Sequence, residues 1–446
     1  MLKIVYPICC GMDVHKSFVY ACIASTNEQG VTTYKSKRFS TFTKDLHFCA
    51  EWLAENNCKD VCMESTGKYW IPVYNILEQT CNVVLAHPKY VKAIKGKKTD
   101  KKDAKWIADI FKHDLVSGSF IPPADIRQLR DLVRYRWKLT NFVVGEKNRA
   151  QNCLTVSNIK LDDVFSDVFG KASSNIITRM LENPSEKITD VANFRTKGMK
   201  ATDEEVLAAV DGEFCPEQAE KLRIIRSHMD SLELCKLNVE SLILSVAEKY
   251  IPQIDLVSTV PGIQTFAAIG IISEIGVDMS VFPTSKHLCS WAGLTPQNNE
   301  SAGKKKTTRI GRAGDYIKPL LVQCALAAIK SKKNSEIRNR YLSIKKRRGH
   351  KKAIIPTHPK ALLFACQNGV GDFHKPLMAE IRTAEIGIEA RYRQDYQIGV
   401  LGFVGAVVGY ESVNNLRWNI LGRKRGNCFD VLVGKRYFIF PKCAKL

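Results

Sequence analysis

Residues 8–24, which read ICCGMDVHKSFVYACIA, decide the fold class of the first part of the chain. Their two apolar runs flank a short polar turn, as in two neighbouring β-strands. Apolar runs then alternate with helical patterns, which predicts strands at 8–14, 18–24, 31–39, 60–64 and 82–86 and helices at 43–56 and 68–79. Strands that alternate with helices indicate an α/β domain, and we place it at residues 1–120.

The middle of the chain, residues 121–250, has few strand signals and is expected to be helical. Near its end, apolar residues recur every three or four positions, at Leu222, Ile225, Met229, Leu232, Val239, Ile243 and Val246. Lys236 interrupts this spacing. The pattern fits a three-heptad coiled coil, in which a polar core residue fixes the register, and equally a long helix packed against its own chain.

Residues 251–355 form a third expected unit, mainly α-helical, with a turn at Pro261-Gly262. Its last part is rich in Lys and Arg. Pro356 and Pro359 then interrupt the helical pattern, because proline removes a backbone donor and clashes with the preceding turn. We assign no fold to the remaining tail, residues 356–446.

The amino-acid composition limits which binding partners and which cellular compartment the protein can have. The chain has 446 residues, with 67 Lys and Arg against 45 Asp and Glu, for a formal net charge of +22. This excess predicts a polyanionic partner, which charge alone leaves open between DNA, RNA and an anionic lipid surface. The 15 cysteines include no CxxC pair, so we expect reduced thiols and no structural zinc site. The longest Gly-rich apolar run, 399–410, is too short to span a bilayer, and no signal-peptide pattern is found. We therefore expect a cytoplasmic protein with no membrane partner.

Four carboxylates stand at the ends of predicted elements. Asp13 interrupts an apolar strand and Glu64 ends another, whereas Asp100 and Asp103 begin a helix with i, i+3 spacing, which places both on one helical face. Neighbouring parallel strands can bring the first two side by side, and a helix packed across them can add the other two. Such a cluster needs cations. Two Mg²⁺ ions about 4 Å apart, held by shared carboxylates, serve phosphodiester chemistry by activating the nucleophile and stabilising the leaving oxygen.

The residues of this cluster also have ordinary interpretations. An acid at a helix start, such as Asp100, is more often a cap or a partner of the helix dipole than a metal ligand. Asp13 is harder to explain in this way, since an unpaired charge inside an apolar strand costs several kcal/mol. The neighbouring lysines either form a solvated surface or receive a phosphate backbone near the metals: Lys97, Lys98, Lys101 and Lys102.

A turn-rich segment at residues 291–304, WAGLTPQNNESAGK, exposes the hydroxyl of Ser301 among cationic side chains. Lys304, at the end of this segment, and Arg309 and Arg312, just beyond it, follow Ser301 in the sequence. Such cations would hold a phosphate and lower the free energy of a serine alkoxide that attacks it. On residue type alone, most serines in such loops are turn residues or caps, so catalysis is the less common alternative.

Two further segments suggest contact with nucleic acid. The turn at Gly262 resembles a helix-hairpin-helix, in which a glycine lets backbone N–H groups approach a phosphate; an ordinary loop between core helices is the alternative. Arg127, Arg130 and Arg134 lie on a largely helical segment with interleaved aromatic residues. A charge run is usually a solvated helix face, but arginine and aromatic planes also stack on unpaired RNA bases.

The runs GMDVHK, MESTGK and KTDKKDA, which carry Asp13, Glu64, Asp100 and Asp103, together resemble the DEDD motif of the insertion sequence 110 family of transposases. These are bridge-RNA-guided recombinases whose amino-terminal domain is similar to the RuvC resolvase, an RNase H-like fold. The resemblance implies Mg²⁺ at the four acids. The run GLTP followed by SAGK resembles the second domain of the family, whose nucleophilic serine maps onto Ser301. Residue 302 is Ala where Gly is usual, and Thr307 and Thr308 are poorer alternative positions.

The resemblance covers roughly residues 10–352 and implies an enzyme that moves a DNA element through a phosphoserine intermediate. Its implied partners are donor and target DNA, a bridge RNA and further copies of the chain, as a dimer or tetramer. Two rivals stay open. A metal-only Holliday-junction endonuclease would form no covalent protein–DNA adduct, and a noncatalytic nucleic-acid-binding protein would use its acids only to pair with lysines. The tail after Pro356 departs from the family, as a frameshifted terminus or as an element-specific extension.

Overall fold

The computed structural model describes residues 2–64, 67–91, 99–184, 186–196, 199–295, 299–301, 304–307, 310, 313–330, 335–357, 423–425, 428–433 and 436–441. The chain forms two compact units, Met1–Val370 and Gly371–Leu446. Each unit is described by itself. The first contains the sheet domain and the helices, and the second contains a small sheet.

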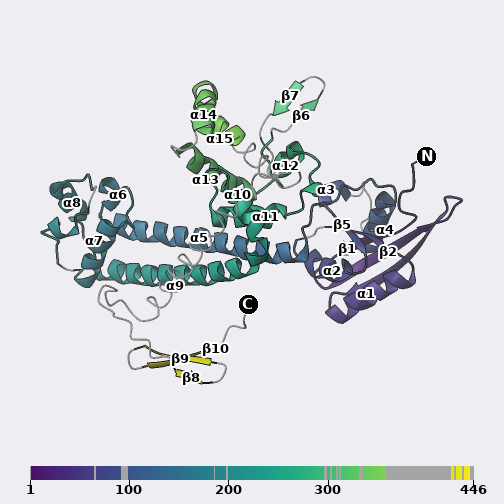
Figure 1. The fold of residues 1–446 in the computed structure, drawn as a ribbon, viewed down its shortest axis with the longest axis horizontal. Coiled ribbons are helices and arrows are strands. Elements are labelled where there is room, and N and C mark those ends of the chain that lie inside the picture. Colours follow the sequence, from purple (N-terminus) through teal and green to yellow (C-terminus); the bar gives the residue numbers. More distant parts are fainter. Residues whose placement is uncertain are drawn as a thin grey trace. The chain divides into compact units, whose positions relative to one another are not determined.

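A five-stranded mixed sheet forms the amino-terminal domain (Figure 1). Its strands are β1 (Ile8–Val14), β2 (Phe18–Thr26), β3 (Thr32–Ser40), β4 (Asp60–Glu64) and β5 (Asn82–Ala86). They lie in the order β3-β2-β1-β4-β5, with β1, β4 and β5 parallel and β2 antiparallel to both of its neighbours. This mixed sheet followed by a helical remainder fits the RNase H-like class expected from the sequence, and the five predicted strands are confirmed.

Helices cover both faces of the sheet. Side chains alternate between the faces of a strand, so Met12 of β1 and Met63 of β4 pack into one core with α1 (Thr43–Glu55) and α2 (Trp70–Leu77). The opposite face carries Cys9, Gly11 and Cys62 and is covered by α3 (Pro88–Val91) and α4 (Asp100–Phe111). Asp13 and Glu64 share the alternation of this second set, so both belong to the α4 face.

Two long helices, α5 (Ala124–Val156) and α9 (Pro216–Ala247), run antiparallel side by side (Figure 1). The apolar stripe predicted on 222–246 faces α5 of the same chain, where Leu139 and Val143 pack on Leu232. The structure thus shows the second of the two alternatives, a helix packed on its own chain. A coiled coil between chains stays a prediction.

Smaller helices pack at the two ends of this pair. One end holds α6 (Leu161–Val164), α7 (Lys171–Glu182) and α8 (Asp203–Val210), which share a core with the end of α5 and the start of α9. The other end holds α10 (Ile251–Ser258), α11 (Thr265–Ile275), α12 (Ser285–Trp291) and α13 (Ile317–Lys330). The start of α5 and the end of α9 share the core of α10–α13, so no gap in packing marks the boundary expected at residue 250.

The last helices of the first unit are α14 (Ser335–Arg348) and α15 (His350–Thr357). α15 includes Pro356 and ends at Thr357, two residues beyond the boundary expected at residue 355, so the expectation that Pro356 ends the helical pattern is wrong. Pro359 lies outside the described residues. The second unit has one antiparallel sheet, of β8 (Arg423–Arg425), β9 (Cys428–Val433) and β10 (Arg436–Pro441). In the described part of the chain, no helix has the length and apolar character needed to cross a membrane.

Candidate active site

The strand register brings Asp13 and Glu64 next to each other. Parallel strands β1 and β4 pair up to Met12 and Met63, and Asp13 and Glu64 are the next residue of each strand. Residues in register on adjacent strands point to the same face of a sheet, so the two acids share the face that α4 covers. This confirms the arrangement that the sequence predicted for the two strands.

Gly11 allows α4 to lie against this face. A Cβ at this position would lie 2.3 Å from both the Ala104 carbonyl oxygen and the Ala108 backbone nitrogen, so any side chain here would push the helix away. The close approach brings the first turn of α4, with Asp100 and Asp103, to the end of β1. Thr99 caps this helix by accepting a hydrogen bond from the Lys102 N–H. Thr99, and not Asp100, is therefore the cap, whereas Asp100 lies in the first turn of α4, where an acid can also interact with the helix dipole.

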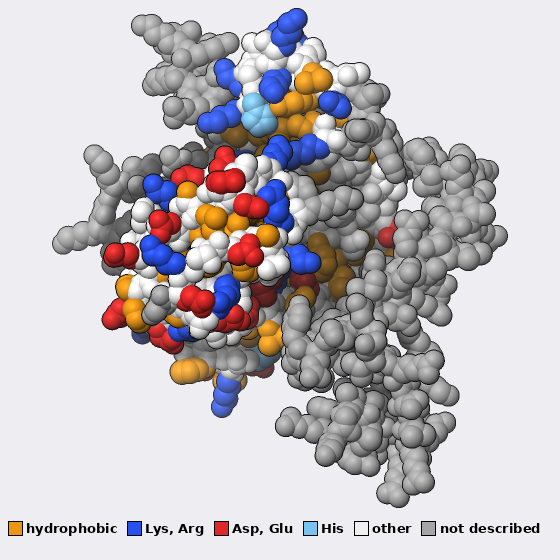
Figure 2. All heavy atoms as spheres, turned by 90° about the vertical axis from the view of Figure 1, so that its left-hand side faces the viewer, with side chains coloured by type: hydrophobic (Ala, Val, Ile, Leu, Met, Phe, Trp, Pro, Cys, Tyr) orange, Lys and Arg blue, Asp and Glu red, His pale blue; other side chains and the backbone are white. Residues whose placement is uncertain are grey.

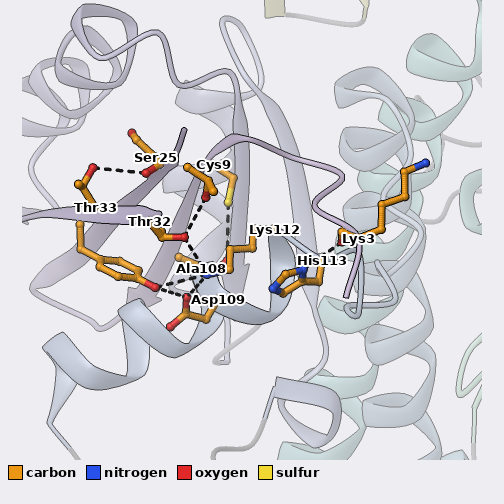
Figure 3. Close-up of polar contacts among 11 residues, drawn as sticks. Lys3, Cys9, Ser25, Thr32, Thr33, Ala108, Asp109, Lys112 and His113 are labelled. Atoms are coloured by element: carbon orange, nitrogen blue, oxygen red, sulfur yellow. Dashed lines mark hydrogen bonds and ion pairs between the residues drawn. The ribbon is translucent and has the colours of Figure 1, made fainter. Parts of the chain in front are cut away.

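A polar network fixes the other end of α4 to the edge of the sheet (Figure 3). The Lys112 ammonium, on the residue that follows α4, donates to Asp109 Oδ1 at 2.7 Å and lies 3.4 Å from the hydroxyls of Thr32 and Tyr34 on β3. Tyr34 donates to the same carboxylate at 2.5 Å. Lys112 is 9% exposed, and burial that would lower its pKa is outweighed by these partners, which raise it. The helix that carries two of the four acids is therefore held at both its middle and its end.

Three potential ligands converge at the end of β1. Asp13, His15 and Asp100 each place one ligand atom within 4.8 Å of the others. The His15 Nε2 atom lies 3.2 Å from Asp13 Oδ2 and 3.5 Å from Asp100 Oδ1. The His15 ring lies on Phe18 across the turn, with 4.5 Å between ring centroids. The sequence analysis gave His15 no role, although its position two residues after Asp13 was a usable signal.

Burial and neighbouring charges both act on the pKa of Asp13. Burial raises the pKa of Asp13, His15 opposes this rise, and the charges of Asp100 and Asp103 add to it. Asp103 thus contributes to the field at Asp13, although it is outside the group of three that converges most closely. Carboxylate oxygens are the donors that hard divalent cations prefer, and a cation would relieve this repulsion. The donor set fits a divalent metal, with carboxylates as the first ligands and the imidazole as an additional donor.

The lysines expected near the acids are placed only in part. Lys101 and Lys102 are exposed in the first turn of α4, next to Asp100 and Asp103. Lys97 and Lys98 lie outside the described residues. Contact of the four lysines with nucleic acid stays a prediction.

The candidate serine lies in a two-stranded hairpin formed by β6 (Asn299–Ser301) and β7 (Lys304–Thr307), in which Ser301 pairs with Lys304. At its base, two glycine turns pack backbone to backbone. A Cβ on Gly293 would lie 2.4 Å from the Ala313 carbonyl oxygen, and one on Gly314 would lie 2.3 Å from the Ala292 carbonyl oxygen. Both glycines have positive φ. The ends of the serine segment are therefore held together by contacts that admit no side chain. Arg309 and Arg312 lie outside the described residues.

Gly262 joins α10 to α11 with φ of +87°. A Cβ there would lie 2.4 Å from the Cys324 carbonyl oxygen and 2.7 Å from the Ala328 backbone nitrogen. The close approach that requires this glycine is therefore to α13 of the same chain, whereas the sequence analysis assigned it to a phosphate. The geometry favours the alternative of a loop between core helices.

The three arginines of α5 have partners within the chain. Arg127 pairs with Glu78, the residue that follows α2, while Arg130 donates to the Ser273 and Glu274 carbonyls and Arg134 donates to both carboxylate oxygens of Glu274. Burial lowers the pKa of Arg130 to about 10. These arginines therefore connect α5 to the sheet domain and to α11, which the sequence did not predict, and their contact with nucleic acid stays a prediction.

Comparison with known families identifies the two domains. Residues 10–159 match a DEDD family model described as a transposase, and residues 254–342 match one described as the transposase IS116/IS110/IS902 family. The chain carries the domains of IS110-family transposases. This confirms the family expected from the motifs and makes the chain a DNA transposase or recombinase, an enzyme. The first match contains all four acids, and the second contains Ser301.

Weak similarity to solved structures accompanies the family match. A RuvC structure from Thermus thermophilus is 12% identical, with a TM-score of 0.21, and the alignment covers 25% of this IS110-family chain and 99% of the other. The Fowlpox virus resolvase, solved with Holliday junction DNA, is 16% identical, with a TM-score of 0.17 and coverage of 23% and 72%. No curated protein matches the chain. At these TM-scores the likeness supports no conclusion, and the fold class rests on the sheet order.

Proposed function

We propose that this IS110-family transposase cuts and rejoins DNA through a phosphoserine intermediate at Ser301, with a bridge RNA that selects the DNA sites. The observation that carries the proposal is the convergence of Asp13 and Asp100 at the end of β1, in a chain whose second family domain contains the serine. Paired carboxylates of this kind serve phosphodiester chemistry, and the serine supplies a nucleophile that water would otherwise provide.

In the proposed step, Ser301 Oγ attacks a DNA phosphorus. The Oγ–P bond forms as one phosphoester bond of the strand breaks, and the serine proton leaves while the departing deoxyribose oxygen gains a proton. The bond energy is kept in the ester, so rejoining needs no nucleotide cofactor. Lys304 pairs with Ser301 in the backbone register of the hairpin, and a cation at this position would favour the alkoxide.

The acids would hold Mg²⁺ near the same phosphate. Asp13, Glu64, Asp100 and Asp103 supply the carboxylates, and their mutual repulsion at Asp13 is what a divalent cation would remove. The bound metal would supply charge neutralisation at the phosphate oxygens. Assembly as a dimer or tetramer, in which acids of one protomer meet the serine of another, is part of the same proposal.

The test is a strand-transfer assay. Purified protein is incubated with Mg²⁺, the RNA from the flanks of its element, and labelled donor and target DNA, and the products are separated on a denaturing gel. We expect a protein–DNA adduct in wild type that Ser301→Ala abolishes. Thr307→Val removes another hydroxyl from the same hairpin and is expected to keep the adduct. Asp13→Asn is expected to abolish both adduct and cleavage.

The rival interpretations give different results. Cleavage that persists in Ser301→Ala without any adduct would show a metal-only nuclease. An adduct lost in Thr307→Val and kept in Ser301→Ala would move the nucleophile to Thr307. Reactions that proceed equally with an unrelated RNA would refute the guide role of the bridge RNA.

A further inference from the structure

α14 and α15 carry a cationic surface that lies outside the motifs of the candidate active site. From residue 337 to residue 355 the sequence contains no Asp or Glu. The exposed cations of this stretch are Arg338, Arg340, Lys345, Lys346, Arg347, Arg348, Lys351 and Lys352, which we call the α14–α15 surface. Figure 2 shows Lys and Arg without Asp or Glu over the upper described part of the molecule, the end at which α14 and α15 lie in Figure 1, whereas the lower described part mixes both charges.

The opposite side of these helices is packed against the protein. Tyr341 of α14 and Ala353 and Ile354 of α15 are buried in a small core with Ala325 of α13. The Tyr341 hydroxyl lies 2.7 Å from His350 Nδ1, which links the two helices across their turn. The apolar face thus fixes the helix pair on α13 and leaves the charged face to solvent.

Several cations on the other helices form ion pairs with acids. Arg179 pairs with Glu186, Arg223 with Glu220, and Lys236 with Glu233. Among the residues that the structure describes, no cation of the α14–α15 surface has an ion pair. Like charges one helical turn apart destabilise a helix, so this arrangement opposes folding unless a polyanion binds it.

We propose that the α14–α15 surface binds the phosphate backbone of duplex DNA. Uniform positive charge without acids matches a phosphate backbone. Single-stranded nucleic acid also requires exposed aromatic side chains for base stacking, and the aromatic residue of this stretch, Tyr341, is 6% exposed. α14 has 14 residues, so it extends about 20 Å, the length of about six successive phosphates on one strand. Most of the surface lies beyond residue 342, where the second family match ends.

The inference rests on the DNA transposase class and does not depend on the serine mechanism. We would therefore measure binding equilibria without divalent metal, so that no cleavage contributes. The variant replaces Lys346, Arg347, Lys351 and Lys352 with Gln and leaves Tyr341, His350 and Lys345 unchanged. The control replaces four other exposed lysines, where acids and cations alternate, with Gln: Lys160, Lys171, Lys200 and Lys221. Both proteins lose four positive charges, so they differ only in where the charge is removed.

We expect the α14–α15 variant to bind a DNA duplex of about 30 base pairs at least about tenfold more weakly than the control at about 0.1 M salt. The slope of log affinity against log salt should become shallower by about three to four, since each lost phosphate contact removes about 0.9. Circular dichroism melts check the fold of both proteins, and Arg338→Gln with Arg340→Gln provides a second variant for the same measurement.

Two results would overturn the inference. The first is equal affinity and equal salt slope in variant and control, which would show that only net charge matters. The second is unchanged affinity for duplex DNA with a selective loss of affinity for the element's RNA, which would assign the surface to RNA. If wild-type protein forms no serine adduct, but the α14–α15 variant still binds duplex DNA more weakly than the control, only the catalytic proposal is refuted. The inference about the α14–α15 surface then stands.

Discussion

Gly11→Ala is expected to separate the acids without unfolding the domain. The added Cβ would lie 2.3 Å from the backbone of Ala104 and Ala108, where ordinary contact begins at 3.4 Å, so α4 must recede by about 1 Å. Asp100 and Asp103 move with the first turn of that helix, whereas Asp13 stays on β1. Metal–ligand distances are set within about 0.2 Å, and a displacement of about 1 Å in an active site lowers rates about 100-fold. We expect a rate loss of that order.

The assay combines three measurements on Gly11→Ala. Urea unfolding should show a loss of about 1–3 kcal/mol, as for other overpacked cores. Calorimetry with Mn²⁺ should show weaker metal binding, and DNA cleavage should fall about 100-fold with partial recovery at high metal concentration. These readouts separate displaced acids from a general loss of folded protein.

A matched control tests whether position matters. Gly212 lies at the end of the α5–α9 pair that is remote from the acids. A Cβ at this position would lie 2.3 Å from the Ser157 carbonyl oxygen. Gly212→Ala should lose similar stability and keep metal binding and cleavage. Wild-type metal affinity in Gly11→Ala, or equal loss of cleavage in both variants, would refute the reasoning that α4 is positioned by Gly11.

Three other predictions concern the helices and the thiols. Glu274→Gln removes a buried carboxylate from the partly buried guanidinium groups of Arg130 and Arg134, so urea unfolding should show a loss of about 3 kcal/mol; a change below about 1 kcal/mol would mean the pairs behave as surface pairs. Leu139→Ala, at the contact between α5 and α9, should lower the free energy of unfolding by about 2–5 kcal/mol. The same change at the exposed Leu237 should leave it nearly unchanged. Unfolding midpoints that rise with protein concentration would instead support contact between chains. After maleimide treatment at pH 7 and pH 9, peptide mapping should find the exposed Cys215 and Cys235 modified rapidly. Cys49 should be protected at both pH values, because burial raises the pKa of its thiol to about 12. Equal labelling of Cys49 would contradict this packing.

Local patterns were sufficient to predict the sheet domain. The bounds of β1, β4 and β5 agree with the sequence because each is a short, largely apolar run that ends at or just before a polar residue. Their register then placed Asp13 and Glu64 on one face, since side-chain alternation leaves no other choice. The helix start at Asp100 was also predictable from spacing, although the capping role fell to Thr99.

Long-range partners could not be read from the sequence. Arg134 and Glu274 are 140 residues apart, and no periodicity connects them. The sequence around Gly262 is compatible with either partner; the packing on α13 explains why the position needs a glycine, and contact with a phosphate stays a prediction. His15 was missed for a related reason, since its approach to Asp100 depends on how α4 crosses β1.

The two charged features of the molecule have opposite effects on DNA. The acids at the end of β1 repel a phosphate backbone, and burial, with smaller contributions from the charges of Asp100 and Asp103, raises the pKa of Asp13. A divalent cation reverses that repulsion, so the acids favour DNA only when metal is present. A net charge of +22 concentrated in part on α14 and α15 attracts DNA without a bound metal ion. Binding and cleavage are therefore expected to depend on different residues, which is why charge removal on α14–α15 and acid displacement at Gly11 can be measured independently.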